Sequence, residues 1–156
     1  MKKFFLHSIL TVMLFVLLGC SSEDESYELS NRVNASTFTL NTPEGWTLIE
    51  DQGIDTYIGR IAGPEDTIYF DQGYLSFGSL QNVIKNEQTI FFQRLKINDV
   101  PSIIHKERRQ GDLDGEIRLS VYLDAGDGQR LNSLYVFDPK DEALIIKIFK
   151  THQFTF

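Results

Sequence analysis

The sequence is short of the residues that several classes of protein need. Its 156 residues include a single cysteine, which excludes both an intramolecular disulfide and a cysteine-based zinc site. Basic residues are in deficit, with 15 Lys and Arg against 22 Asp and Glu and a formal net charge of −7. Because a nucleic-acid binder needs a basic surface, we expect no nucleic-acid partner. Hydrophobic residues make up 42% of the chain, which suits one globular domain and excludes a wholly disordered or collagenous protein.

Long apolar runs are also absent except at the start of the chain. Two lysines precede a run of about 15 mostly apolar residues from Phe4 to Leu18, which is the anatomy of a secretory signal. A transmembrane helix needs about 20 apolar residues, and His7 already interrupts this run. The charges that follow are acidic, at residues 23–25, so no basic stop-transfer cluster is present. The sequence therefore predicts a cleaved signal peptide over residues 1–19.

The apolar run ends in Leu17-Leu18-Gly19-Cys20, which resembles a bacterial lipobox, the substrate motif of lipoprotein signal peptidase. The resemblance implies cleavage between Gly19 and Cys20 and attachment of lipid to the Cys20 thiol. A small residue before the cysteine lets the protease reach the bond, and a thiol is nucleophilic enough for the lipid transfer. The implied mature protein is anchored through acylated Cys20 to the outer membrane of a Gram-negative cell, with the lipid bilayer as its partner.

An acidic segment follows the lipobox. Residues 21–36 hold four acidic residues, one arginine and almost no large apolar side chain, so we expect residues 20–36 to form a flexible tether. Its beginning, Ser22-Glu23-Asp24-Glu25, resembles the acidic tag that sends lipoproteins to the outer face of the cell in some Gram-negative lineages. Surface exposure and a simple solvated stalk both remain open.

Residues 37–156 are expected to form a single globular domain in which strand signals dominate. The predicted strands cover residues 38–40, 46–50, 55–62, 66–71, 89–97, 100–108, 117–124 and 130–137. Asn98 and Asp99 both tolerate positive φ, so they predict a tight hairpin between two of these strands. Apolar and polar residues alternate through residues 117–124, which predicts one buried and one solvent-facing side.

The end of the domain changes to a helical period. Asp138 is expected to cap a helix over about residues 139–151, with Pro139 at its first position. A second, weaker helix is predicted over residues 79–86. The apolar face of the final helix is expected to cover a sheet with Leu144, Ile145, Ile148 and Phe149.

Three of these features together resemble PsbP-like domains. They are Pro43-Glu44-Gly45-Trp46 after a first strand, a β meander, and a final helix that runs into residues 148–154. The superfamily includes the photosystem II extrinsic subunit and bacterial DcrB-type lipoproteins. The resemblance implies an α+β fold, with either the C-terminal helix alone or that helix and a second one packed on an antiparallel meander. Members are mostly binding or accessory proteins.

Few residues of the domain suggest chemistry. Asp71 and Tyr74 lie in its densest aromatic and polar segment and are the candidate ligand-binding residues. Two Asp- and Gly-rich segments, 112–116 and 124–128, bracket one strand and would lie roughly 25–30 Å apart. We therefore interpret both as turns, and we predict no metal site and no cofactor. His105 is expected on the solvent-facing side of a strand, with His152 at the end of the final helix.

Two hypotheses for function follow. The first is a non-catalytic binding or accessory protein of the cell envelope, whose partner is another envelope protein or a small ligand. The second is a cell-envelope hydrolase that uses carboxylates near Asp71. A cleft with two or more convergent titratable groups of shifted pKa would favour the hydrolase.

Overall fold

The computed structural model describes residues 27–73, 78–111, 115–128 and 130–155, and within them ten strands and one helix form two layers. The smaller antiparallel sheet contains β1 (Asn31–Asn34), β2 (Phe38–Thr42) and β10 (Gln153–Phe154). The larger one contains β3 (Thr47–Asp51), β4 (Tyr57–Ala62), β5 (Thr67–Gln72), β6 (Thr89–Ile97), β7 (Val100–Arg108), β8 (Ile117–Asp124) and β9 (Leu131–Phe137). The helix is α2 (Glu142–Phe149).

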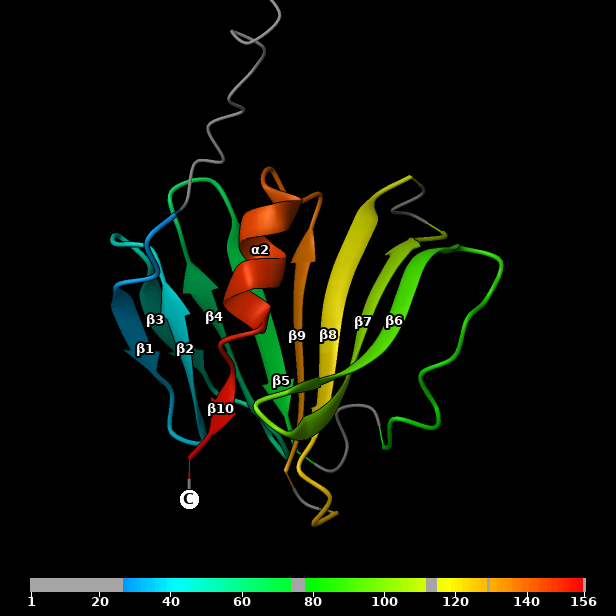
Figure 1. Cartoon of the computed structure of the whole chain (residues 1–156), viewed down its shortest axis with the longest axis horizontal. Helices are drawn as coiled ribbons and strands as arrows, with labels where there is room; N and C mark the ends of the chain where they lie inside the picture. The colour runs from blue at the N-terminus through cyan, green and yellow to red at the C-terminus, as the bar shows by residue number, and fades with distance from the viewer. Residues whose placement is uncertain (1–26, 74–77, 112–114, 129, 156) are drawn as a thin grey trace, which may run out of the picture.

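The strands are ordered β1-β2-β10 in the small sheet and β3-β4-β5-β9-β8-β7-β6 in the large one. Figure 1 shows the small sheet and α2 together as one layer in front of the large sheet. Neighbouring strands of the large sheet are antiparallel throughout, and the β6–β7 hairpin forms one edge. The domain is therefore a two-layer structure in which a helix completes the smaller layer.

This architecture corrects the predicted α+β, PsbP-like fold class. About 50% of the described residues are in strands, and α2 is the only helix that they form. Residues 79–86, where a second helix was predicted, form turns and irregular backbone. No helix in the described part of the chain is long and apolar enough to cross a membrane. The prediction did not include the small sheet. This sheet covers the large sheet in a place where helices were expected.

The folded domain also begins earlier than residue 37. Residues 31–36 were predicted as tether, but β1 pairs with β2 from Asn31 to Asn34. Val33 and Ala35 are each only 6% exposed and belong to the core. An edge strand needs only one apolar face, so a segment this polar can still pair and bury the side chains of Val33 and Ala35.

The helix begins later than predicted. Asp138, the expected N-cap, has φ +43°, which is left-handed backbone. The N-cap is Asp141, whose carboxylate accepts a hydrogen bond from the Leu144 amide at 2.9 Å. The carboxylate of Asp66, a residue only 8% exposed, accepts a hydrogen bond from the Lys140 amide at 3.0 Å. Two carboxylates thus accept hydrogen bonds from backbone amides at the N-terminal end of the helix. Their negative charge also stabilises the positive end of the helix dipole.

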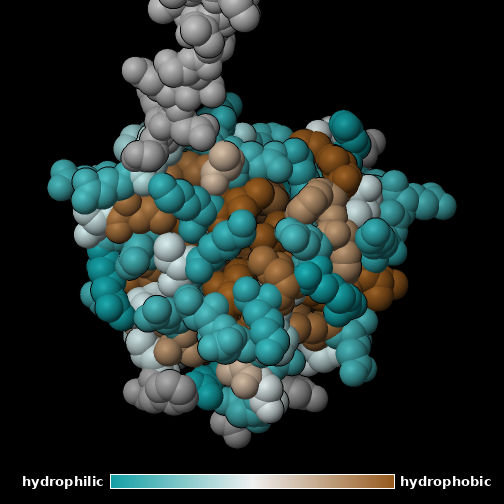
Figure 2. All heavy atoms as spheres, viewed as in Figure 1, coloured by the Kyte–Doolittle hydropathy of each residue, from teal (hydrophilic) through white to brown (hydrophobic). Residues whose placement is uncertain are grey.

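The hydrophobic core lies between the two layers. Phe38 of β2 meets Phe70 of β5 edge to face, with ring centroids 5.1 Å apart, so the two sheets contact each other directly. The helix adds the fully buried side chains Ile145, Ile148 and Phe149, which confirms the predicted burial of that face. On the outside of this layer, Figure 2 shows mostly hydrophilic residues, with hydrophobic ones visible between them near the centre.

The β6–β7 hairpin matches the prediction. The two strands pair up to Ile97 and Val100, and the loop between them consists of Asn98 and Asp99. These residues have φ values of +47° and +67°, as a two-residue type I′ turn requires. The hairpin is important for the site because its turn forms one wall of the largest cavity described below.

Candidate ligand-binding site

Asp71, the predicted ligand residue, lies on the outer face of the large sheet. Its register partners there are Ile58 on β4 and Ser133 on β9. Tyr69 lies on the same face, and Phe70 points into the core between them, as the alternation of the strand predicts. Tyr74, the second predicted residue, falls outside the described residues. The cavities described below are lined by other residues, and a ligand role for Asp71 stays a prediction.

Aromatic and cationic side chains surround Asp71 on this face. The Tyr69 and Tyr135 rings stack with centroids 5.5 Å apart, and the Arg118 guanidinium lies 4.2 Å from the centroid of Tyr135. Burial raises the pKa of Tyr135, and the charge of Asp71 adds to this rise while Arg118 opposes it. One carboxylate oxygen of Asp71 is buried without a hydrogen-bond partner among the described residues. A hydrolase that uses carboxylates near Asp71 stays a prediction.

His105 is buried rather than solvent-facing. It is 4% exposed, and its Nε2 lies 3.0 Å from the Thr89 hydroxyl and 3.9 Å from a Glu107 carboxylate oxygen. The segment before β6 covers this part of the outer face, since Val83 is buried and lines a cavity of about 270 Å³ together with His105. Burial lowers the pKa of His105, with Glu107 opposing the change. The prediction of a solvent-facing side was therefore wrong for this half of the sheet.

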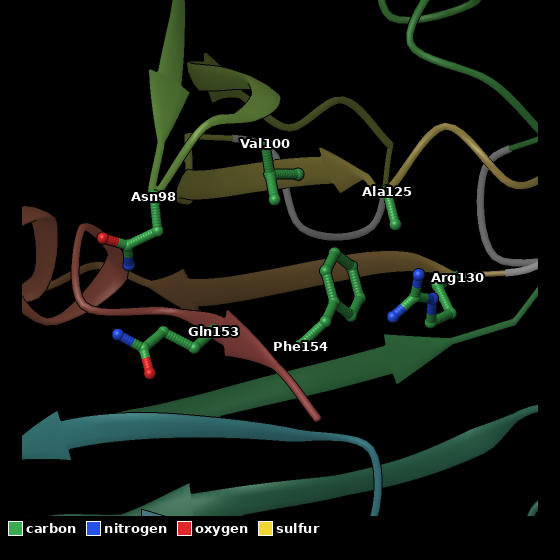
Figure 3. A pocket seen from close by; sticks show the side chains of 6 residues that line it. All are labelled: Asn98, Val100, Ala125, Arg130, Gln153 and Phe154. Carbon is green, nitrogen blue, oxygen red and sulfur yellow. The ribbon is translucent and has the colours of Figure 1, made fainter. Parts of the chain in front are cut away.

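The largest of the described cavities, about 340 Å³, opens where β10 faces the large sheet. It lies between the β6–β7 turn, the β8–β9 loop and β10 (Figure 3). In this view Asn98 and Gln153 lie at one end, Arg130 lies at the other, and the Phe154 ring stands between them. The residues that line the cavity are Asn98, Val100, Ala125, Arg130, Gln153 and Phe154.

The amide end of the cavity is held by the β6–β7 turn. The Asn98 side-chain amide donates a hydrogen bond of 2.7 Å to the backbone carbonyl of His152. This contact fixes the turn to the segment that leads into β10 and leaves the Asn98 Oδ1 as a hydrogen-bond acceptor. The Gln153 side chain is exposed, and no described residue is hydrogen-bonded to its amide. Two amide groups, one positioned and one free, thus lie at this end.

The guanidinium end is held by the β8–β9 loop. Asp127 accepts hydrogen bonds from the backbone amide of Arg130, at 2.8 Å, and from its side-chain Nε. The Asp124 carboxylate accepts from the Gly126 amide at 2.7 Å, and the Ala125 amide donates to the Arg130 carbonyl at 3.0 Å. Both carboxylates of this segment serve the turn, as predicted for it. The other Asp- and Gly-rich segment, 112–116, lies largely outside the described residues.

Behind the cavity lies His152, which was predicted at the end of the final helix. It is fully buried, stacked at 5.2 Å on Phe38 and edge to face at 4.7 Å with Phe154. Its Nε2 lies 3.0 Å from the side-chain amide nitrogen of the fully buried Asn132. Burial lowers the pKa of His152 to about 3, so the ring is neutral at physiological pH. His152 supports the Phe154 ring and does not act as a cation at the helix end.

A third cavity, of about 280 Å³, lies at the N-terminal end of α2. It is lined in part by Tyr27, Trp46 and Leu144, and by the carboxylates of Asp66 and Asp141 that already bind helix amides. In the described part of the chain, no three His, Cys, Asp or Glu side chains gather as a metal site would require. The cavity at β10 is therefore the best-formed candidate, because it combines the largest volume with amide groups free to bind a ligand.

Sequence reasoning did not find this site. Its polar residues come from a hairpin turn, a loop and the last strand, and they are separated by dozens of positions. The Asn98 turn was predicted, but only the pairing of β10 with β2 brings Gln153 and Phe154 opposite it. No pattern of residue spacing in the sequence predicts that Gln153 and Phe154 lie opposite Asn98.

Comparison with known proteins gives no family and no function. No protein-family profile matches this chain, and no curated protein matches it. A crystal structure of a protein from Bacteroides thetaiotaomicron VPI-5482 is similar over 76% of this chain, with 16% sequence identity and a TM-score of 0.48. This chain covers 45% of the length of that protein.

Proposed function

We propose that this chain is a non-catalytic binding protein of the Gram-negative cell envelope, and that its ligand site is the cavity at β10. The observation that carries the proposal is the lining of the cavity, two amides, a guanidinium and an aromatic ring. These groups can hold a ligand by hydrogen bonds and packing. The neighbouring His152, whose pKa burial lowers to about 3, is neutral at physiological pH.

The anchor in this proposal is acylated Cys20, in the outer membrane. Tyr27, the first described residue, lies beside α2, where its carbonyl accepts a hydrogen bond of 2.6 Å from Lys147. Cys20 lies seven positions before Tyr27, a reach of at most about 25 Å. Figure 1 places the start of the described chain and β10 at opposite ends of the molecule. An anchored domain would therefore present its cavity away from the bilayer, where ligands or partner proteins have access.

Replacing Cys20 with serine is expected to abolish lipid attachment, because a hydroxyl is too weak a nucleophile for the transfer. The wild type should partition into detergent and carry the mass of acyl chains, whereas the variant should stay in the aqueous phase. Intact-mass spectrometry and detergent phase partition measure both properties. A wild-type mass equal to that of bare residues 20–156, or an uncleaved N-terminus, would show that the lipobox interpretation is wrong.

Export of the anchored domain to the outer face of the cell is the second part of the proposal, and the acidic run Ser22-Glu23-Asp24-Glu25 supports it. Changing Glu23, Asp24 and Glu25 to alanine should leave lipidation and folding intact but retain the domain on the periplasmic side. Protease added to intact cells should digest the wild type and spare the variant. If the wild type resists until the outer membrane is opened, the acidic run is only a stalk.

A further inference from the structure

We propose that the cavity at β10 binds a neutral, polyhydroxylated ring, that is, a sugar, either free or as one residue of a glycan. This inference rests on the binding function proposed above and adds the chemical class of the ligand. It is drawn from three properties of the lining: its charge, its hydrogen-bonding groups and its ring.

The charge of the lining favours a neutral ligand. Arg130 is the only charged residue among the six that line the cavity, and its guanidinium is paired with the Asp127 carboxylate. A carboxylate or phosphate on the ligand would have to compete with Asp127 for the same cation, on a protein whose formal net charge is −7.

The amide groups favour hydroxyls. An amide side chain offers an acceptor oxygen and two N–H donors, and a hydroxyl is likewise both donor and acceptor. Asn98 uses its amide nitrogen to bind the His152 carbonyl, so its Oδ1 is left to accept from a ligand hydroxyl. Gln153 has both kinds of group free and lies at the same end of the cavity (Figure 3). Neighbouring hydroxyls on one ring would satisfy both amides at once.

The Phe154 ring and the volume favour a single six-membered ring. Phe154 is half-buried and held from behind by His152, so it presents a rigid apolar surface for the C–H groups of a sugar. The Arg130 guanidinium lies 5.7 Å from the centroid of this ring and bounds the cavity on its far side. A volume of about 340 Å³ lies at the lower end of the range for small-molecule sites, about 300–1,000 Å³.

The test is an NMR titration of the purified lipoprotein, in a detergent that contains no sugar. The probes are neutral hexoses, an N-acetylhexosamine, their methyl glycosides, glucuronate, and cyclohexanol as a ring of similar size with one hydroxyl. We expect at least one neutral sugar to shift the side-chain amide signals of Asn98 and Gln153 more strongly than cyclohexanol or glucuronate does. Equal binding of a methyl glycoside would indicate a glycan residue, and binding of the reducing sugar alone would indicate a free monosaccharide.

Gln153→Ala should weaken sugar binding about fivefold to tenfold, since one hydrogen bond to a hydroxyl is lost. The matched control is Gln93→Ala, which removes an exposed glutamine from β6 outside the cavity and should leave affinity unchanged.

Preferential binding of cyclohexanol or glucuronate at these signals would overturn the sugar assignment but support a binding cavity. If no probe shifts the signals, or if Gln153→Ala has no effect, the sugar assignment is wrong. If none of the probes shifts the side-chain amide signals of Asn98 and Gln153, the proposed binding function is contradicted as well.

Discussion

Replacing Phe149 with alanine is expected to lower the free energy of unfolding by about 3–5 kcal/mol. Phe149 is the last residue of α2, is fully buried, and belongs to the core between the two layers. Removing its ring both forfeits the transfer of apolar surface out of water and leaves a cavity that close-packed neighbours can only partly fill. Whole-protein stabilities are typically about 5–15 kcal/mol, so this one change would remove a large fraction of the total.

The chain provides a matched control for this measurement. Phe91 lies on the edge strand β6 and is 42% exposed, so Phe91→Ala deletes the same ring from a site with little burial. Its effect should be about 1 kcal/mol or less. Urea unfolding followed by Trp46 fluorescence and by circular dichroism measures both variants. Equal losses at the two positions would mean that α2 does not pack against the sheets as described.

Acid is expected to destabilise the protein through His152. Burial lowers the pKa of this imidazole to about 3 in the folded state, against an ordinary value of 6.5. Below pH 6.5 the unfolded chain therefore binds a proton at His152 that the folded protein does not, and stability falls as the pH falls. The contribution of this residue amounts to a loss of about 2 kcal/mol at pH 5 and about 4 kcal/mol at pH 3. Above about pH 7 the residue contributes no pH dependence.

His152→Phe isolates this contribution. Phenylalanine keeps an aromatic ring between Phe38 and Phe154 but cannot be protonated. At pH 7 the variant should be less stable than the wild type, because it leaves the buried Asn132 amide without its imidazole partner. As the pH falls to 4 that deficit should shrink or reverse, while the other titrating groups act alike in both proteins. A difference that stays constant from pH 7 to pH 4 would mean that the pKa of His152 is not depressed.

The sequence predicted most of the large sheet because the signals for its strands are local. Asn98 and Asp99 allow the backbone of a tight turn, so the β6–β7 hairpin could be placed to the residue. The alternation of residues 117–124 likewise predicted that Leu119, Val121 and Leu123 would be buried. It did not predict that Ser120, on the opposite side, is buried too. The burial of Ser120 depends on a distant segment of the chain that lies over the outer face of the sheet.

The elements that were missed depend on contacts between distant parts of the chain. β1 has one large apolar residue, Val33, and it is a strand because β2 lies beside it. β10 has only two residues and pairs with β2 from the other end of the chain. Asp138 looked like a helix cap from its neighbours alone, but Asp66, from a distant turn, holds the backbone where the helix begins. Short strands and caps of this kind have no periodicity to detect.

The sequence by itself determined the strands of the large sheet, the buried face of α2 and the acidic character of the chain. It also carries the resemblance to a lipobox on which the proposed membrane anchor rests. Only the tertiary structure decided that a second sheet covers the first, that His152 is a neutral core residue, and that Asn98, Arg130 and Phe154 share a cavity. The physical reason is that patterns of φ preference and hydrophobic period act over a few residues. A cavity and a buried imidazole are made by surfaces that meet only when the chain has folded.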